Sequence, residues 1–117
     1  MPKRILIADD NSIVRNIVKN FLTAKMDLVC EEAADGSEAV EHANQSKPDL
    51  IILDFAMPRM NGAEAAQALK RSMPKVPIVL YTVFDVPIKL VRDTGFDAVA
   101  LKPEGVDKLA ECVRSLL

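Results

Sequence analysis

The chain has 117 residues, of which 50% are hydrophobic and 4% aromatic, and its formal net charge is −2 at pH 7. This length predicts one domain, residues 1–117, with enough apolar residues for one core. The weak charge, the lack of a Lys/Arg tract and the few aromatic residues argue against direct nucleic-acid binding. No apolar segment has the roughly 20 residues of a membrane span, and the first apolar run, which ends at Asp9, is too short for a signal peptide. We therefore expect a cytoplasmic domain without membrane contact.

Short apolar runs alternate with helical segments along the chain. Strands are predicted at residues 5–8, 28–32, 50–53, 76–81 and 98–101. Helices are predicted to follow them at residues 13–22, capped by Asn11 or Ser12, and at 37–44, 62–71, 87–94 and 105–117. Because the strands are near-continuous apolar runs and do not alternate with polar residues, they indicate a parallel sheet that helices cover on both faces, with right-handed crossovers.

Polar residues directly follow four of the predicted strands. Asp9 and Asp10 follow the first strand, Asp54 the third, Thr82 the fourth and Lys102 the fifth. In a parallel sheet these points lie at one edge, which is where open α/β sheets bind ligands. Each residue alone has an ordinary structural interpretation, such as a helix N-terminal acid or a surface lysine. Their joint occurrence favours a functional site.

The residue types at this edge suit a cation and a phosphoryl group. Two like charges about 4 Å apart repel by roughly 4 kcal/mol at an effective dielectric near 20, so three carboxylates need a cation or raised pKa values. Hard oxygen ligands in an open site suit Mg²⁺, which can bridge a carboxylate and a phosphoryl oxygen. Lys102 adds a fixed positive charge and Thr82 a hydroxyl donor. A carboxylate such as Asp54 can form an aspartyl phosphate.

These residues, taken in order, carry a resemblance to a known family. The sequence resembles the receiver domain of two-component response regulators, of the chemotaxis-regulator type. The matching segments span the chain and are Ile5-Leu6-Ile7-Ala8-Asp9-Asp10, Leu53-Asp54, Met57-Pro58, Met60-Asn61-Gly62, Thr82 and Lys102-Pro103. The resemblance implies a (βα)5 doubly wound, flavodoxin-like domain whose parallel strands have the order 2-1-3-4-5.

The resemblance also implies a role for each residue at the edge. Mg²⁺ would be bound by Asp10 directly, by Asp9 mainly through water, by Asp54, and by the backbone carbonyl of Ala56. Asp54 would be the phosphoacceptor.

Two further residues would act on the phosphoryl group. Thr82 would bond it and move toward it, and Lys102 would pair with Asp54 and then with the phosphate. The peptide bond before Pro103 would be cis.

The function implied by the resemblance is that of a phosphorylation-activated signalling switch. The phosphoryl group would come from a phosphohistidine on a sensor histidine kinase or phosphotransfer protein, as in a phosphorelay. The phosphorylated domain would then change its binding to a downstream output protein or domain. It would be regulatory and not an enzyme, although it takes part in its own phosphotransfer and dephosphorylation. A homodimer through the face formed by the last strand and the last two helices is left open.

Three other interpretations remain open from the residues alone. The first is a receiver that no longer accepts phosphate and acts only as a binding module. The second is an aspartyl-phosphate phosphatase of the haloacid-dehalogenase type, which needs Asp-x-Asp where this chain has adjacent Asp9 and Asp10. The third is a flavin-binding module, which needs a Ser/Thr/Gly-rich loop after the first strand.

Two positions depart from the family pattern. Val83 stands where a small residue is usual, and Val99 stands where an aromatic switch residue is frequent. We therefore expect phosphorylation with altered coupling, in which either Phe84 or Tyr81 replaces the usual ring or the output face signals by another rearrangement. The apolar segment 84–91 is either core packing of a short helix or an exposed partner surface.

Overall fold

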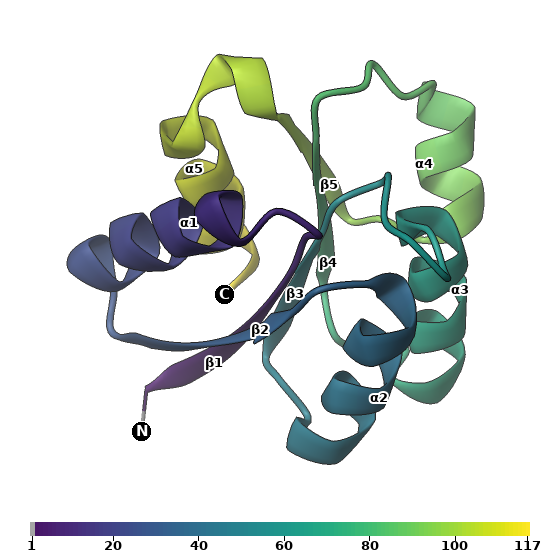
Figure 1. Ribbon diagram of the computed structural model, residues 1–117, viewed down its shortest axis with the longest axis horizontal. Coiled ribbons are helices and arrows are strands. Elements are labelled where there is room, and N and C mark those ends of the chain that lie inside the picture. Colours follow the sequence, from purple (N-terminus) through teal and green to yellow (C-terminus); the bar gives the residue numbers. More distant parts are fainter. Residues whose placement is uncertain (1) are drawn as a thin grey trace.

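The computed structural model describes residues 2–117 and shows one five-stranded parallel sheet between two layers of helices (Figure 1). The strands are β1 (Lys3–Ala8), β2 (Leu28–Ala33), β3 (Leu50–Leu53), β4 (Ile78–Thr82) and β5 (Ala98–Leu101). The helices are α1 (Ser12–Lys25), α2 (Gly36–Ser46), α3 (Gly62–Ser72), α4 (Ile88–Thr94) and α5 (Val106–Leu116), with a short 3₁₀ helix η1 (Lys102–Glu104) before α5. The order β2-β1-β3-β4-β5 confirms the predicted doubly wound, flavodoxin-like α/β fold.

The pleat of the central strands sorts their side chains between the two helical layers. In Figure 1, α1 and α5 lie on one side of the sheet, and α2, α3 and α4 lie on the other. One core cluster joins the sheet to α2 and α3 and includes Leu6, Ile51, Leu80, Ala65 and Leu69. The other joins it to α1 and α5 and includes Ile5, Ile52, Val79, Leu22 and Leu109. Because every residue of β3 is at most 1% exposed, this strand is a rigid base for Asp54, which follows it.

The predicted elements are all present, with shifts at their ends. The β4 ladder begins at Ile78 and not at Val76, because Pro77 has no N–H to donate and only its carbonyl takes part, accepting from Ile51. Thr82 pairs with Leu101 and so ends β4 instead of following it. Of the two candidate caps for α1, Asn11 is the one observed, since its side chain accepts from two backbone N–H groups.

The expectation of a cis peptide bond before Pro103 is wrong. None of the peptide bonds between described residues is cis. Pro103 instead occupies the first turn of η1, where the restricted φ of proline suits the helical backbone and its missing N–H costs no hydrogen bond.

Several apolar side chains of the helical layers are exposed. Ile13 and Ile17 on α1 are 69% and 54% exposed, whereas Val18 and Leu22 on the same helix are buried. The apolar segment 84–91 divides in the same way: Val86 and Val91 pack against the core, while Phe84 and Ile88 are 49% and 69% exposed. Core packing is therefore confirmed for part of the segment, and the rest is exposed, while its use as a partner surface stays a prediction. Among residues 2–117, none of the helices combines the length and apolar character needed to cross a bilayer.

Gly36, the first residue of α2, lies against the loop that follows β3. A Cβ at this position would be 1.9 Å from the carbonyl oxygen of Met60 and 2.9 Å from the Met60 Cβ. Contacts under 3 Å with backbone atoms require the backbone to move, so glycine allows the close approach of α2 to this loop.

We expect Gly36→Ala to destabilise the protein by about 1–3 kcal/mol, the usual cost of overpacking a well-packed site. In a helix without this contact, the same change would stabilise by up to about 1 kcal/mol, so the sign of the effect tests the contact. Urea unfolding would measure it, with Ser37→Ala at the exposed neighbouring position as the control. A Gly36→Ala variant as stable as the wild type would contradict the close packing.

Candidate functional site

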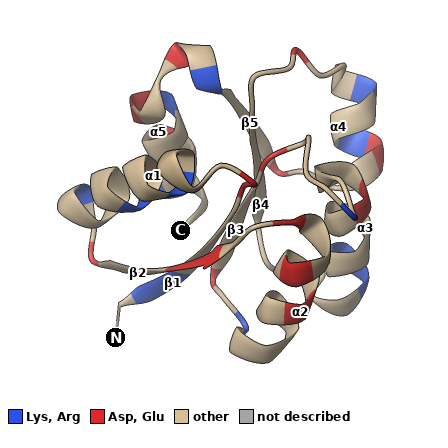
Figure 2. Ribbon diagram, in the orientation of Figure 1, with Lys and Arg blue, Asp and Glu red and all other residues tan. Residues whose placement is uncertain are grey.

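The carboxyl ends of the parallel strands bring the predicted site residues together. Asp9 follows β1 and Asp54 follows β3, and these strands are neighbours, with Ala8 paired to Leu53. The Asp54 N–H donates to the Ala8 carbonyl at 3.0 Å, which continues the ladder up to the site. Figure 2 shows the acidic residues in the loops after β1 and β3, at the centre of this edge. The predicted convergence of Asp9 and Asp54 is therefore observed.

Three carboxylates at this edge form one cluster. Asp9, Asp10 and Asp54 each offer an oxygen, and the three oxygens lie within 4.8 Å of one another. Asp9 and Asp54 are 3% and 6% exposed, whereas Asp10 is exposed. Two acids are thus removed from water, and the third remains open to solvent at the mouth of the site.

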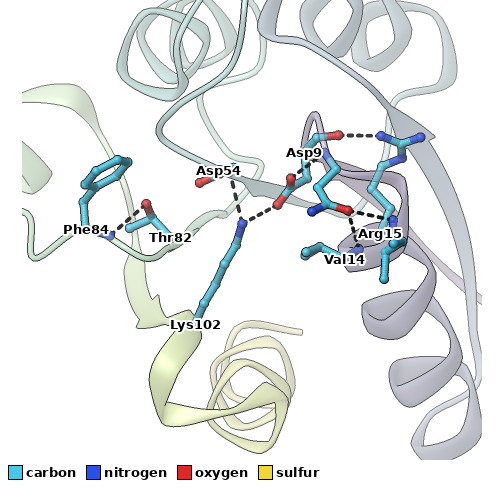
Figure 3. A network of polar contacts seen from close by, with 9 residues as sticks. Asp9, Val14, Arg15, Asp54, Thr82, Phe84 and Lys102 are labelled. Atoms are coloured by element: carbon cyan, nitrogen blue, oxygen red, sulfur yellow. Dashed lines mark hydrogen bonds and ion pairs between the residues drawn. The ribbon is translucent and has the colours of Figure 1, made fainter.

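Lys102 lies between the two buried acids (Figure 3). Its Nζ is 2.7 Å from Asp9 Oδ2 and 3.2 Å from Asp54 Oδ2. It also lies 5.8 Å from the centroid of the Tyr81 ring, within the range of a cation–π contact. One ammonium for three carboxylates leaves an excess of negative charge.

The second oxygen of Asp54 is the feature of this cluster most suited to a cation. Asp54 Oδ1 is buried and has no hydrogen-bond partner among the described residues. Leaving a buried charged oxygen without a partner costs free energy, and a bound cation or donor would remove that cost. With the oxygens of Asp9 and Asp10 beside it, the donor set consists of hard oxygens, which fits Mg²⁺.

Burial and charge shift the pKa values of the paired groups in definite directions. Burial, and next the negative charge of Asp9, raises the pKa of Asp54 above the usual range of an aspartate, although Lys102 acts against this. For Lys102, burial lowers the pKa, but the hydrogen bond with Asp9 and the charge of Asp54 outweigh it and leave the pKa raised. Both shifts agree with the geometry, because Lys102 is closer to Asp9 and so only partly offsets the burial of Asp54.

Thr82, at the end of β4, is fully buried, and its hydroxyl oxygen accepts a hydrogen bond. Its Oγ1 accepts the Phe84 N–H at 3.3 Å (Figure 3), so the hydroxyl hydrogen can be donated to another group. The Phe84 ring packs edge-to-face on the Phe55 ring, with centroids 6.3 Å apart. Val83, which lies between Thr82 and Phe84 in the sequence, is 58% exposed. Thr82 is therefore hydrogen-bonded to the backbone of Phe84, a residue whose aromatic side chain is half-exposed.

The loop that carries Ala56 is held in place by contacts that the sequence analysis missed. Gly62 N–H donates to the Phe55 carbonyl at 2.8 Å, which closes the loop around the exposed Ala56. Arg59 has a left-handed backbone, with φ 67°, and its guanidinium pairs at 2.6 Å with Asp35, which is buried and also caps α2. A non-glycine residue in this conformation costs of order 1–3 kcal/mol and persists where its surroundings hold it.

Comparison with known proteins identifies the family. The chain matches the model of the response regulator receiver domain over residues 5–114, so it belongs to this family, whose members act in two-component signal transduction. The response regulator protein VraR of Staphylococcus saprophyticus is 33% identical over 117 aligned positions, which cover 97% of this chain and 56% of VraR. The chain thus spans about half the length of the curated relatives it matches.

Solved structures agree with this assignment. The chemotaxis protein CheY4 of Vibrio cholerae is 29% identical with a TM-score of 0.89, and the match covers 100% of both chains. The response regulator domain of CheB from Thermotoga maritima is 26% identical with a TM-score of 0.86, covering 99% of this chain and 94% of that domain. The domain is therefore a regulatory receiver domain, and its fold is similar to that of these chemotaxis proteins.

We expect Asp54→Asn to stabilise the protein when divalent cations are removed with a chelator. The pKa of Asp54 is higher in the folded protein than in the unfolded chain. Between these two pKa values the folded state holds more protons, so stability falls as the pH rises through the interval and the full cost persists above it. Asn removes this cost, and Lys102 keeps its contact with Asp9.

Urea unfolding over a series of pH values would measure this effect. Asp85→Asn is the control, because Asp85 is exposed in the loop before α4. Equal stability of Asp54→Asn and wild type above the pH of the transition would contradict a buried, under-compensated carboxylate.

Proposed function

We propose that residues 1–117 form a phosphorylation-activated signalling switch in which Asp54 accepts a phosphoryl group from a phosphohistidine, with Mg²⁺ bound. The observation that carries this proposal is the buried Asp54 carboxylate, one oxygen of which faces Lys102 while the other has no hydrogen-bond partner within residues 2–117. A carboxylate placed in this way is available as a nucleophile and is surrounded by groups that can stabilise the charge of a phosphoryl group.

The metal would be held by Asp9, Asp10, Asp54 and the backbone carbonyl of Ala56. When bound, Mg²⁺ neutralises charge on the carboxylates and on the incoming phosphoryl oxygens. Exposed Asp10 is placed to ligate it directly, whereas Asp9 is already bonded to Lys102 and to the Asn11 N–H and suits a contact through water. This division of roles is consistent with the observed burial of the two acids.

In the transfer, an oxygen of Asp54 forms the new bond to phosphorus while the bond between phosphorus and the donor imidazole nitrogen breaks. Lys102 Nζ, 3.2 Å from Asp54, is positioned to follow the charge from the carboxylate to the phosphoryl oxygens. The Thr82 hydroxyl can donate to a phosphoryl oxygen and still accept from Phe84 N–H. The two groups thus serve charge stabilisation and sensing, respectively.

The partners follow from this chemistry. The donor would be a sensor histidine kinase or a phosphotransfer protein, and we expect the exchange in the cytoplasm. The relatives' greater length supports an output domain or protein as the second partner. We propose a role that is regulatory and not enzymatic, without direct contact to nucleic acid, and we retain a homodimer through α4, β5 and α5 as a mode of self-association.

The alternatives receive less support. The clustering of the three acids with Lys102 supports a working phosphorylation site over a binding module that has lost it. The family match covers residues 5–114, which argues against a haloacid-dehalogenase phosphatase or a flavin-binding module.

Incubation with Mg²⁺ and acetyl phosphate should add the mass of one phosphoryl group to the wild type and none to Asp54→Ala. Intact-mass spectrometry would detect it, with Asp85→Ala as a matched control that removes an exposed aspartate and should be modified normally. The addition should disappear when Mg²⁺ is replaced by a chelator. No addition to the wild type from acetyl phosphate or a histidine kinase would overturn the proposal.

Binding of Mg²⁺ with a beryllium fluoride phosphoryl mimic should shift the Phe84 amide resonance in ¹H–¹⁵N NMR spectra. This amide donates to Thr82 Oγ1, so it reports directly on movement of that hydroxyl. Thr82→Val keeps the shape but lacks the hydroxyl, and it should lose most of the shift. If the resonances of residues 82–101 do not change in the wild type, the switching part of the proposal fails while phosphorylation can still stand.

A further inference from the structure

Arg15, on the first turns of α1, reaches back to the end of β1. Its NH1 donates to the backbone carbonyl of Asp9 at 2.6 Å (Figure 3), and its Nε donates to Glu32 Oε1 on β2 at 3.0 Å. The side chain is only 16% exposed. A charged donor to a carbonyl, with its second donor on a carboxylate, fixes both ends of the guanidinium.

The carbonyl that Arg15 holds belongs to the peptide that joins Asp9 to Asp10. The orientation of this peptide therefore influences the direction in which the Asp10 side chain projects from the backbone. The Asp9 carboxylate is held separately, by the Asn11 N–H at 2.9 Å and by Lys102. The Asp10 carboxylate takes part in none of the hydrogen bonds or ion pairs between described residues, so apart from its own rotamer its position is set by the backbone that carries it.

We propose that Arg15 is a positioning residue for cation binding: by holding the Asp9–Asp10 peptide, it keeps the exposed Asp10 carboxylate beside those of Asp9 and Asp54. The inference rests on the proposed function in taking Mg²⁺ as the ion. It concerns a residue that does not touch the ion and acts on the site through the backbone.

The charge of Arg15 makes this proposal testable by the sign of the effect. A guanidinium near a cation site repels the cation, so removal of its charge alone would strengthen Mg²⁺ binding. Loss of positioning would weaken binding instead. Lys19 provides a matched control, because its Nζ lies 3.8 Å from the same Glu32 and it has no bond to Asp9.

Isothermal titration calorimetry of the unphosphorylated protein with MgCl₂ would measure Kd for the wild type, Arg15→Met, Arg15→Lys and Lys19→Met. Loss of a residue that orients metal ligands typically weakens binding 10–100-fold, so we expect Kd of Arg15→Met to rise about 10-fold. Arg15→Lys keeps the charge but has no planar fork, and its Kd should fall between those of wild type and Arg15→Met. Lys19→Met should bind as tightly as wild type or slightly more tightly.

The outcomes separate this inference from the proposed function. If the wild type binds Mg²⁺ and Arg15→Met binds equally well or more tightly, the positioning role is overturned and the proposed function stands. If the wild type does not bind Mg²⁺, both fail. Urea unfolding in a chelator identifies a purely structural role, which would lower stability without raising Kd in the folded variants. If Arg15→Met does not fold, Arg15→Lys decides alone, since its charge is unchanged and any loss of affinity must come from geometry.

Discussion

The contact on which the rest of this site depends is that of the Lys102 ammonium with two buried carboxylates. Parallel strands deliver Asp9 and Asp54 to neighbouring points of one edge, where burial weakens the screening of their repulsion. Lys102 contacts both, but Asp10 adds a third acid, so the edge keeps an excess of negative charge. That excess suits the site to a divalent cation and, with the cation bound, to a phosphoryl group.

The structure around the acidic site is held more firmly on the side of α2 and α3 than on the side of α4. On the side of α2 and α3, the loop after β3 is fixed by the close packing of Gly36 and by the ion pair of Arg59 with Asp35. On the side of α4, the helix has seven residues and no side-chain cap, and Phe84 before it is half-exposed. A firmly held half around Asp54 and a less constrained half beyond Thr82 agree with the roles that we propose, in which Asp54 accepts the phosphoryl group and Thr82 senses it.

The strand ends and their polar residues could be predicted because each is marked locally. An apolar run that stops at Asp54 or before Lys102 is visible in a few residues of sequence, and parallel topology then puts these points at one edge. Arg15 and Arg59 could not be found in this way. Arg15 bonds to a backbone carbonyl, and Arg59 bonds to an aspartate 24 residues away. Neither contact leaves a local pattern in the sequence that would set these arginines apart from others. The trans bond before Pro103 was likewise missed, because the resemblance implied the other isomer.

The sequence by itself determined the alternation of strands and helices, the class of fold and the set of side chains available for chemistry. Only the tertiary structure decided how adjacent residues divide the work: Asp9 is buried against Lys102 while Asp10 faces solvent, and Asn11 rather than Ser12 caps α1. The physical reason is that neighbours in the chain carry almost the same local signal. Their burial, hydrogen-bond partners and pKa values are set by groups that arrive from distant strands, as the raised pKa of Asp54 illustrates.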